Sequence, residues 1–241
     1  MRKIDVCLSP DLIELYNLSG KVVVVVDILR ATSCMTTGIA HGVNSIKPVA
    51  TLAECQELQF KGYTAAAERN GKKVDGFDLG NSPFDYMDEE LRGKDIAVTT
   101  TNGTLAITKS MDAEQVIIGS FLNFSAIINY LKRIKHDVVV HCAGWKGKVN
   151  MEDSLYAGAV VDALNGQMDY ACDAPKIVHS LYLQAKGNML DFMQNSSHAK
   201  RLTKLSIQRD FEYCLKFDEF KNIPVLKGDH LMKMGISDML I

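Results

Sequence analysis

The stretch VVVVVDILRATS, residues 22–33, decides how this 241-residue chain folds. Its five consecutive valines, Val22 to Val26, are typical of a strand that is buried on both faces, as strands of parallel sheets are. The strand ends at Asp27, and Thr32 or Ser33 can cap a following helix. A strand, a short polar turn and a helix form the unit from which parallel α/β sheets are built.

The same alternation recurs along the chain and predicts the fold class. Beyond about residue 176 the sequence predicts mostly helix. The pattern favours a layered α/β/α fold with a mainly parallel or mixed sheet. Residues 1–241 form one unit, or two α/β lobes with the site between them and a split near residues 110–175. Further strands are expected at 45–49, 64–67, 95–101, 115–118 and 137–142. Helices are expected at 52–61, 104–110, 125–135 and 151–164, with Thr104 as the cap of the second and Asn150 as the cap of the last.

The composition is that of an ordinary globular protein, with 47% hydrophobic residues, 23% charged residues and a net charge of −2. Nothing indicates the basic patch that a nucleic-acid or membrane partner usually requires. No apolar run approaches the roughly 20 residues that cross a bilayer, and the charged N-terminus does not resemble a secretory signal. We therefore expect a cytoplasmic protein and leave a homodimer open. The six cysteines form no CxxC pair, which disfavours structural zinc and indicates small core residues.

Three strand-to-helix junctions, at residues 26–33, 99–104 and 142–147, share one composition of Asp, Thr, Asn and Gly. Ligands of parallel sheets bind beyond the carboxyl ends of the strands, where helix N-termini favour anions. The same residue types also form caps and turns without any ligand, so each junction alone allows both interpretations. A fourth polar segment, residues 68–83, is longer than an ordinary connection, and long ordered loops are often functional.

The acidic residues at these junctions allow two interpretations. A carboxylate at Asp27, the end of a buried strand, is costly unless a cation compensates its charge. Arg30 would do so in a structural ion pair, and a bound Mg²⁺ would do so in a functional site, since Mg²⁺ prefers carboxylate oxygens. Glu152 and Asp153 begin a helix, where the helix dipole favours carboxylates even without a metal. The metal candidates are Asp27, Asp78, Glu152 and Asp153, and the anion-binding cations are Arg30, Arg69 and Lys146.

Known phosphatase motifs are absent or incomplete at these junctions. A strand that ends in Asp-x-Asp is excluded, because Leu29 stands two residues after Asp27. The cysteine-phosphatase motif is nearly present: His141-Cys142 is followed after five residues by Lys148, but lysine lacks the planar fork of arginine. A covalent mechanism at Cys142 therefore stays open. The chain contains neither a phosphate-binding Walker loop nor a Gly-x-Ser-x-Gly elbow.

Five motifs stand in order along the chain: VVDILRAT at 25–32, Glu68-Arg69, GFDLGNSP at 76–83, TTTNGT at 99–104, and the segment from Cys142 through Glu152-Asp153 to Gly158. Together they resemble the 2-phosphosulfolactate phosphatase family over roughly residues 5–228. The family usually has glycine where Asn70 stands, but asparagine tolerates left-handed backbone angles, so we expect the turn to survive. A looser match continues with Ser197-His198, Asp210, Cys214, Asp218 and Ile223-Pro224.

The resemblance implies Mg²⁺-dependent hydrolysis of a small anionic phosphate monoester, 2-phosphosulfolactate, to sulfolactate and phosphate, a step of coenzyme M synthesis. On this interpretation Asp27 ligates the metal or orients the attacking water, and Arg30 and Arg69 bind the phosphate. The alternative is a non-catalytic protein that binds a phosphorylated or sulfonated metabolite. The substrate-binding candidates are Asn81, Ser82, Thr100, Thr101, Asn102, Gly103, Thr104 and Lys146.

Overall fold

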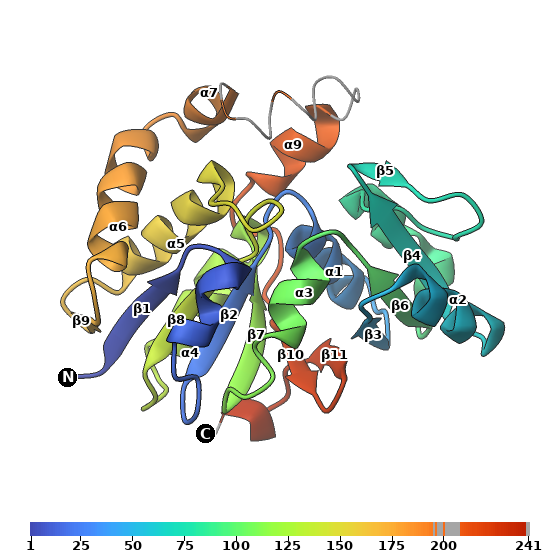
Figure 1. The fold of residues 1–241 in the computed structure, drawn as a ribbon, viewed down its shortest axis with the longest axis horizontal. Helices are drawn as coiled ribbons and strands as arrows, with labels where there is room; N and C mark the ends of the chain where they lie inside the picture. The colour runs from blue at the N-terminus through green and yellow to red at the C-terminus, as the bar shows by residue number, and fades with distance from the viewer. Residues whose placement is uncertain (195, 197–199, 201–207, 240–241) are drawn as a thin grey trace.

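The strands lie in one sheet, flanked by helices (Figure 1). The computed structural model describes residues 1–194, 196, 200 and 208–239. Within these residues the strand order is β5-β4-β6-β3-β11-β10-β7-β2-β8-β1-β9. The bounds are β1 Lys3–Cys7, β2 Val22–Val26, β3 Ser45–Pro48, β4 Thr64–Arg69, β5 Lys72–Lys73, β6 Asp95–Thr99, β7 Gln115–Gly119, β8 Val138–Cys142, β9 Asp169–Tyr170, β10 Pro224–Lys227 and β11 His230–Lys233.

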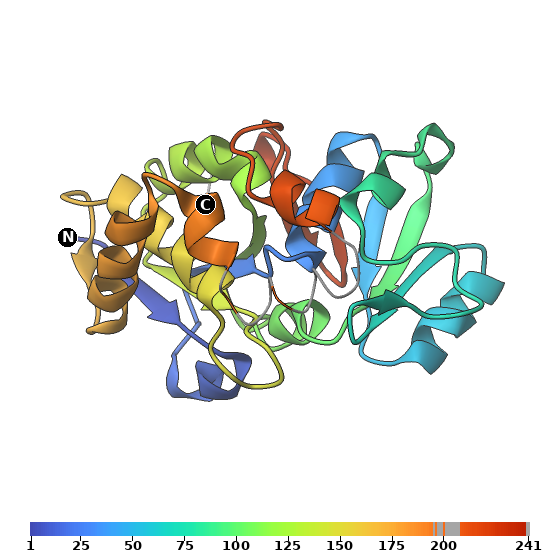
Figure 2. The same ribbon diagram turned by 90° about the horizontal axis from the view of Figure 1, so that it is seen from above.

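Helices cover both faces of this sheet, so the predicted α/β/α layering is confirmed. Figure 2 shows α6 (orange) at one end of the molecule and α2 (cyan) at the other. Short 3-10 turns include η1 Pro10–Leu15, η2 Pro83–Met87 and η4 Phe121–Asn123. The α-helices are α1 Ala31–Ala40, α2 Leu52–Phe60, α3 Gly103–Thr108, α4 Phe124–Leu131, α5 Met151–Ala163, α6 Ala174–Ala185, α7 Met189–Gln194 and α9 Gln208–Cys214.

Strand β2 is buried on both faces, as its valines predict. Val22, Val24 and Val26 pack into the hydrophobic cluster under α4, α5 and α6. Val23 and Val25 pack into the opposite cluster, under α1 and α3. Because alternate residues of a strand point to opposite faces, one run of five valines contributes to both layers of the core. A third cluster lies between α2 and strands β4 and β6.

The sheet consists of two groups of parallel strands joined by an antiparallel hairpin. One group is β7, β2, β8, β1 and β9, and the other is β4, β6 and β3. The hairpin β10–β11 meets each group through a single residue pair, Val225 with Ile117 and Leu231 with Ile46. A prediction of mostly helix beyond residue 176 was therefore wrong for residues 224–233. Strands of four residues carry too short a pattern, and these depend on their neighbours in the sheet. The split near 110–175 stays a prediction.

The predicted helix caps are corrected at two junctions. Helix α1 begins after Arg30, with no side-chain cap. Thr32 instead closes the turn before the helix: its hydroxyl accepts from the Asp27 N–H at 3.1 Å, and its own N–H donates to the Asp27 carbonyl at 3.0 Å. Helix α3 begins after Asn102 rather than at Thr104. At α5 the predicted cap is confirmed, since the Asn150 side chain accepts from the Asp153 N–H.

Two further expectations concern the cysteines and the membrane. Five cysteines are buried free thiols, and Cys172 is an exposed one, so most are core residues as expected. In the described part of the chain, no helix is both long and apolar enough to span a bilayer.

Helix α6 packs closely on α5 at Gly158, which generates a prediction about stability. A Cβ atom at this position would lie 2.1 Å from the Val178 carbonyl oxygen and 2.7 Å from the Tyr182 Cβ. Gly158→Ala should therefore push α6 outward and lower the free energy of unfolding by about 1–3 kcal/mol. Urea denaturation measures this loss. Gly187→Ala, where a Cβ meets nothing within 4 Å, is the control and should cost nothing. Equal stability of the two variants would contradict the packing argument.

Candidate functional site

The carboxyl ends of both parallel groups meet at one place. The Lys146 N–H, after β8, donates to Asn102 Oδ1, after β6, at 3.0 Å. Arg30, after β2, donates through Nη2 to the carbonyl of Gly71, after β4, at 2.9 Å. Loops that are distant in the sequence are thus hydrogen-bonded across the join between the groups. This meeting point gathers most of the predicted site residues.

Gly103 allows the starts of α1 and α3 to approach each other. A Cβ at Gly103 would lie 2.7 Å from the Ala31 Cβ and 2.9 Å from Asp27 Oδ2. Asp27 is buried at the end of β2, and its carboxylate faces this narrow gap. Glycine is required here by the close approach of the two helices and the carboxylate. The role of Gly103 is thus to make room for Asp27.

A fully buried carboxylate, Asp153, connects two of the loops. Its Oδ1 accepts from the Ile28 N–H at 3.0 Å, in the turn after β2. Its Oδ2 accepts from the Gly144 N–H at 3.1 Å and from Asn150 Nδ2 at 2.8 Å, in the loop after β8. Three donors compensate for the loss of water around the carboxylate. Asp153 therefore fixes the two loops that carry Asp27 and Lys146.

Asp27, Glu152 and Asp153 form a cluster of like charges. Burial, together with the negative charges of Asp27 and then Glu152, raises the pKa of Asp153 well above its usual value. A bound cation would relieve this repulsion, and carboxylate oxygens are ligands that Mg²⁺ prefers. Among the described residues, no group of three or more His, Cys, Asp or Glu side chains is placed so that it could hold a metal ion by itself. Water and substrate would therefore complete the coordination of a Mg²⁺, as they usually do. The three donors to Asp153 suit a role in holding the loops of the site in place.

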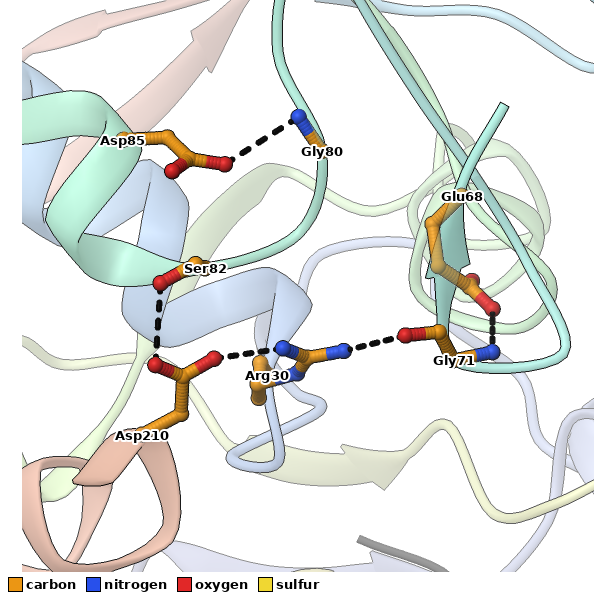
Figure 3. Close-up of polar contacts among 7 residues, drawn as sticks. All are labelled: Arg30, Glu68, Gly71, Gly80, Ser82, Asp85 and Asp210. Carbon is orange, nitrogen blue, oxygen red and sulfur yellow. Dashed lines mark hydrogen bonds and ion pairs between the residues drawn. The ribbon is translucent and has the colours of Figure 1, made fainter. Parts of the chain in front are cut away.

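Arg30 is held by a partner that the sequence analysis did not assign. Its Nη1 lies 2.5 Å from Asp210 Oδ2 on α9, and both side chains are only 5% exposed (Figure 3). Ser82 donates to the other oxygen of Asp210 at 2.9 Å. The ion pair considered for Arg30 was with Asp27, but its guanidinium is directed to Asp210 and Gly71. The charge of Arg30 is thus neutralised within the protein.

Glu68 and Arg69 fasten the end of β4 to the turn after β6. Glu68 is buried and accepts from the Gly71 N–H and from the N–H and hydroxyl of Thr101. Arg69 donates through Nη2 to Thr99 Oγ1 at 3.0 Å and through Nη1 to the Glu68 carbonyl at 2.7 Å. These bonds fix the plane of a guanidinium group that is only partly buried. No role was predicted for Glu68, although it belongs to the Glu-Arg motif.

Lys146 reaches across the site to the turn after β4. Its Nζ donates to Asn70 Oδ1 at 3.2 Å. Both residues have left-handed backbone angles, with φ of +50° at Lys146 and +55° at Asn70. The turn expected to survive at Asn70 is therefore present. In the residues that the structure describes, neither Lys146 nor Arg69 forms an ion pair with a carboxylate.

Several predicted substrate-binding groups are instead engaged in the turns. The Thr100 hydroxyl accepts from the Thr104 N–H, and the Thr104 hydroxyl donates to the Thr100 carbonyl, both at 3.2 Å. The hydroxyl of Thr101 donates a hydrogen bond to Glu68, and the hydroxyl of Ser82 donates one to Asp210. Of this set Asn81 is different, because its buried Oδ1 has no hydrogen-bond partner in the described structure. The hydrogen bonds of the threonines and of Ser82 therefore position the loops.

Asp78 lies apart from the other predicted metal candidates, so the structure does not bring the four carboxylates together. Its carboxylate is exposed and accepts from the Ala65 N–H at 2.8 Å and from Gln59 Nε2 at 3.1 Å. Ala65 lies near the amino end of β4, whereas Arg69 lies at the carboxyl end. Segment 70–79 folds back along β4. Ala65, the partner of Asp78, lies four residues before Arg69 in the strand, which places Asp78 roughly 13 Å from the carboxyl end of β4 at about 3.3 Å per residue.

The near-miss cysteine motif lies in the core. Cys142 is fully buried in β8, and burial, followed by the charge of Asp153, raises the pKa of its thiol well above the usual value. His141 is also fully buried, hydrogen-bonded through Nδ1 to Ser110 Oγ, and burial lowers its pKa to about 4. Neither a thiolate nor an imidazolium is favoured here. The geometry disfavours a covalent cysteine mechanism.

The fold is that of a layered α/β protein, and its site places buried carboxylates and two cations where the strand ends meet. The chain belongs to the 2-phosphosulpholactate phosphatase family, whose model matches residues 7–229. A protein of Caldanaerobacter subterraneus subsp. tengcongensis named probable 2-phosphosulfolactate phosphatase is 40% identical over 226 residues, 89% of this chain and 94% of that protein. A protein of Thermotoga maritima with the same name is 41% identical over 225 residues, 92% of this chain and 95% of its own. The predicted family is confirmed.

The burial of Cys142 predicts the behaviour of a variant. Cys142→Ala should keep phosphatase activity within about threefold, since a buried neutral thiol acts as a small core residue. The free energy of unfolding should fall by about 1 kcal/mol through the small cavity. Steady-state kinetics and urea denaturation of the same preparation measure both. A loss of activity of a thousandfold in a folded variant would instead support covalent catalysis at this cysteine.

Proposed function

We propose that this chain is a Mg²⁺-dependent phosphate-monoester hydrolase that converts 2-phosphosulfolactate to sulfolactate and phosphate, a step toward coenzyme M. The name of the family and of its relatives supports the substrate. One observation carries the chemistry: three buried carboxylates, Asp27, Glu152 and Asp153, lie where the strand ends meet, beside loops that present Arg69 and Lys146.

The balance of charge at the site supports an anionic substrate. Arg30 is neutralised by Asp210, whereas Arg69 and Lys146 form no ion pair in the described part of the chain. 2-Phosphosulfolactate carries a phosphate, a carboxylate and a sulfonate group. Arg69 offers a planar fork and Lys146 a point charge on a flexible stem. On this proposal Arg69 and Lys146 bind the anionic groups, and Arg30 supports the loops around them.

Asp27 and Glu152 would hold the Mg²⁺, with Asp153 keeping their loops in place. When bound, the metal supplies positive charge that stabilises the oxygens of the transferred phosphoryl group. Asp27 holds a water molecule for attack on phosphorus or contributes an oxygen to the metal, and its burial limits alternative orientations. Burial on the floor of the site also strengthens each electrostatic interaction with the substrate.

The proposal is tested by the release of phosphate. We expect turnover of 2-phosphosulfolactate with Mg²⁺, loss of activity after removal of metal by a chelator, and recovery on addition of Mg²⁺. Phospholactate, which lacks the sulfonate, should be a poorer substrate because one anionic contact is lost. Full turnover by a metal-free preparation would refute the metal dependence. Tight binding of these esters without any phosphate release would favour the non-catalytic binding protein.

Asp27→Asn separates a functional carboxylate from a structural one. The amide keeps the shape and removes one negative charge from the cluster with Glu152 and Asp153. We expect kcat to fall by at least roughly 100-fold. The melting temperature of the metal-free variant should stay level or rise, because like-charge repulsion is reduced. Mg²⁺ should raise the melting temperature of the wild type and should leave that of the variant unchanged. A variant that is unstable but fully active in its folded fraction would show that Asp27 is structural.

A further inference from the structure

Asp210 is a buried carboxylate on α9, and the sequence motifs predicted no role for it. Its two oxygens have separate partners, Arg30 Nη1 at 2.5 Å and Ser82 Oγ at 2.9 Å. Arg30 and Asp210 are separated by 180 residues and belong to different elements. A buried ion pair adds little net stability, but loss of one partner leaves an uncompensated charge. The main effect of the pair is therefore to fix the positions of the Arg30 and Asp210 side chains relative to each other.

The contacts of Asp210 continue into the anion-binding loops (Figure 3). Arg30 uses its second Nη to bind the Gly71 carbonyl, and the Gly71 N–H donates to Glu68. Glu68 in turn binds the N–H and hydroxyl of Thr101, in the turn after β6. A continuous series of hydrogen bonds thus connects α9 with the turn that carries Arg69 and Asn70. The Gly80 N–H also donates to Asp85 Oδ2, and this hydrogen bond fixes the segment that leads to Ser82.

The position of α9 does not depend on Asp210 alone. Phe84 of η2 packs against Tyr213 of α9 with ring centroids 5.0 Å apart, and the Arg209 guanidinium lies 3.7 Å from the Phe84 ring centroid. These contacts lie beside the Ser82–Asp210 hydrogen bond. Helix α9 therefore has an aromatic attachment to η2 that a substitution at Asp210 leaves in place. A substitution at Asp210 should therefore change the position of the Arg30 guanidinium more than the position of α9.

We propose that Asp210 is a positioning residue for the anion site. Its carboxylate fixes the guanidinium of Arg30, and Arg30 fixes the 69–71 turn from which Arg69 and Asn70 face the substrate. The fork of Arg30 is required because its two Nη atoms bind acceptors on separate elements. The length of the Asp210 side chain is required because both of its oxygens are engaged. This inference rests on the proposed function of the loops as an anion site.

The test measures binding of inorganic phosphate in the presence of Mg²⁺ by titration calorimetry, with melting curves to confirm folding. Asp210→Asn should raise the Kd for phosphate at least tenfold. Asp210→Glu, which keeps the charge but moves the oxygens, should also raise it. The control is Glu212→Gln, which removes a charge from the exposed face of the same helix and should change Kd less than twofold. A residue that only neutralised Arg30 would give the opposite result for Asp210→Asn, since phosphate would bind more tightly to the uncompensated cation.

A double-mutant cycle tests whether Asp210 acts through Arg30. The tenfold effect of Asp210→Asn should shrink to less than threefold in an Arg30→Lys background, because the fork that Asp210 positions is already gone. An equal effect in both backgrounds, or Asp210→Glu with wild-type affinity, would overturn the proposal. Binding of phosphate requires no turnover, so the positioning role of Asp210 and the proposed hydrolysis of 2-phosphosulfolactate can fail separately. If the cycle shows coupling between Asp210 and Arg30 but the protein does not hydrolyse 2-phosphosulfolactate, the proposed substrate is refuted and the positioning role stands.

Discussion

The buried carboxylate of Asp153 is the constraint on which the site depends. A carboxylate without water is stable only if donors surround it, and three donors from two different loops do so here. Ile28 belongs to the turn after β2, and Gly144 and Asn150 belong to the loop after β8. The requirement for hydrogen bonds therefore sets the distance between these loops. It also places Asp153 beside Asp27 and Glu152, where their charges repel.

The site divides its charged groups between two functions. Arg30 and Glu68 are buried, and their contacts hold the loops of the two strand groups together. Arg69 and Lys146 are less buried and form no ion pair among the described residues. This division has a physical reason: a charge that is already neutralised contributes less to the binding of an external ion. Arg69 and Lys146 are therefore the cations that can act on an anionic ligand.

The sequence predicted the fold class correctly and individual contacts less well, and the structure brings several of the candidate site residues together. Asp27, Glu152 and Asp153 were expected together, since they follow strands whose carboxyl ends share an edge. Asp78 belonged to the same motif-rich segment as Arg69, but the segment reverses along β4 and places Asp78 at the other end of the strand. The contact of Asp210 with Arg30 was not predicted, because the two residues are 180 positions apart in the sequence.

By itself the sequence determined the strand of five valines, the cap at Asn150 and the left-handed turn at Asn70. These features depend on the conformational preferences of single residues and on contacts within a few positions. Only the tertiary structure decided that a hairpin joins two parallel groups and that Arg30 pairs with Asp210. A hydrogen bond depends on distance in space, and that distance is set by the packing of elements far apart in the chain.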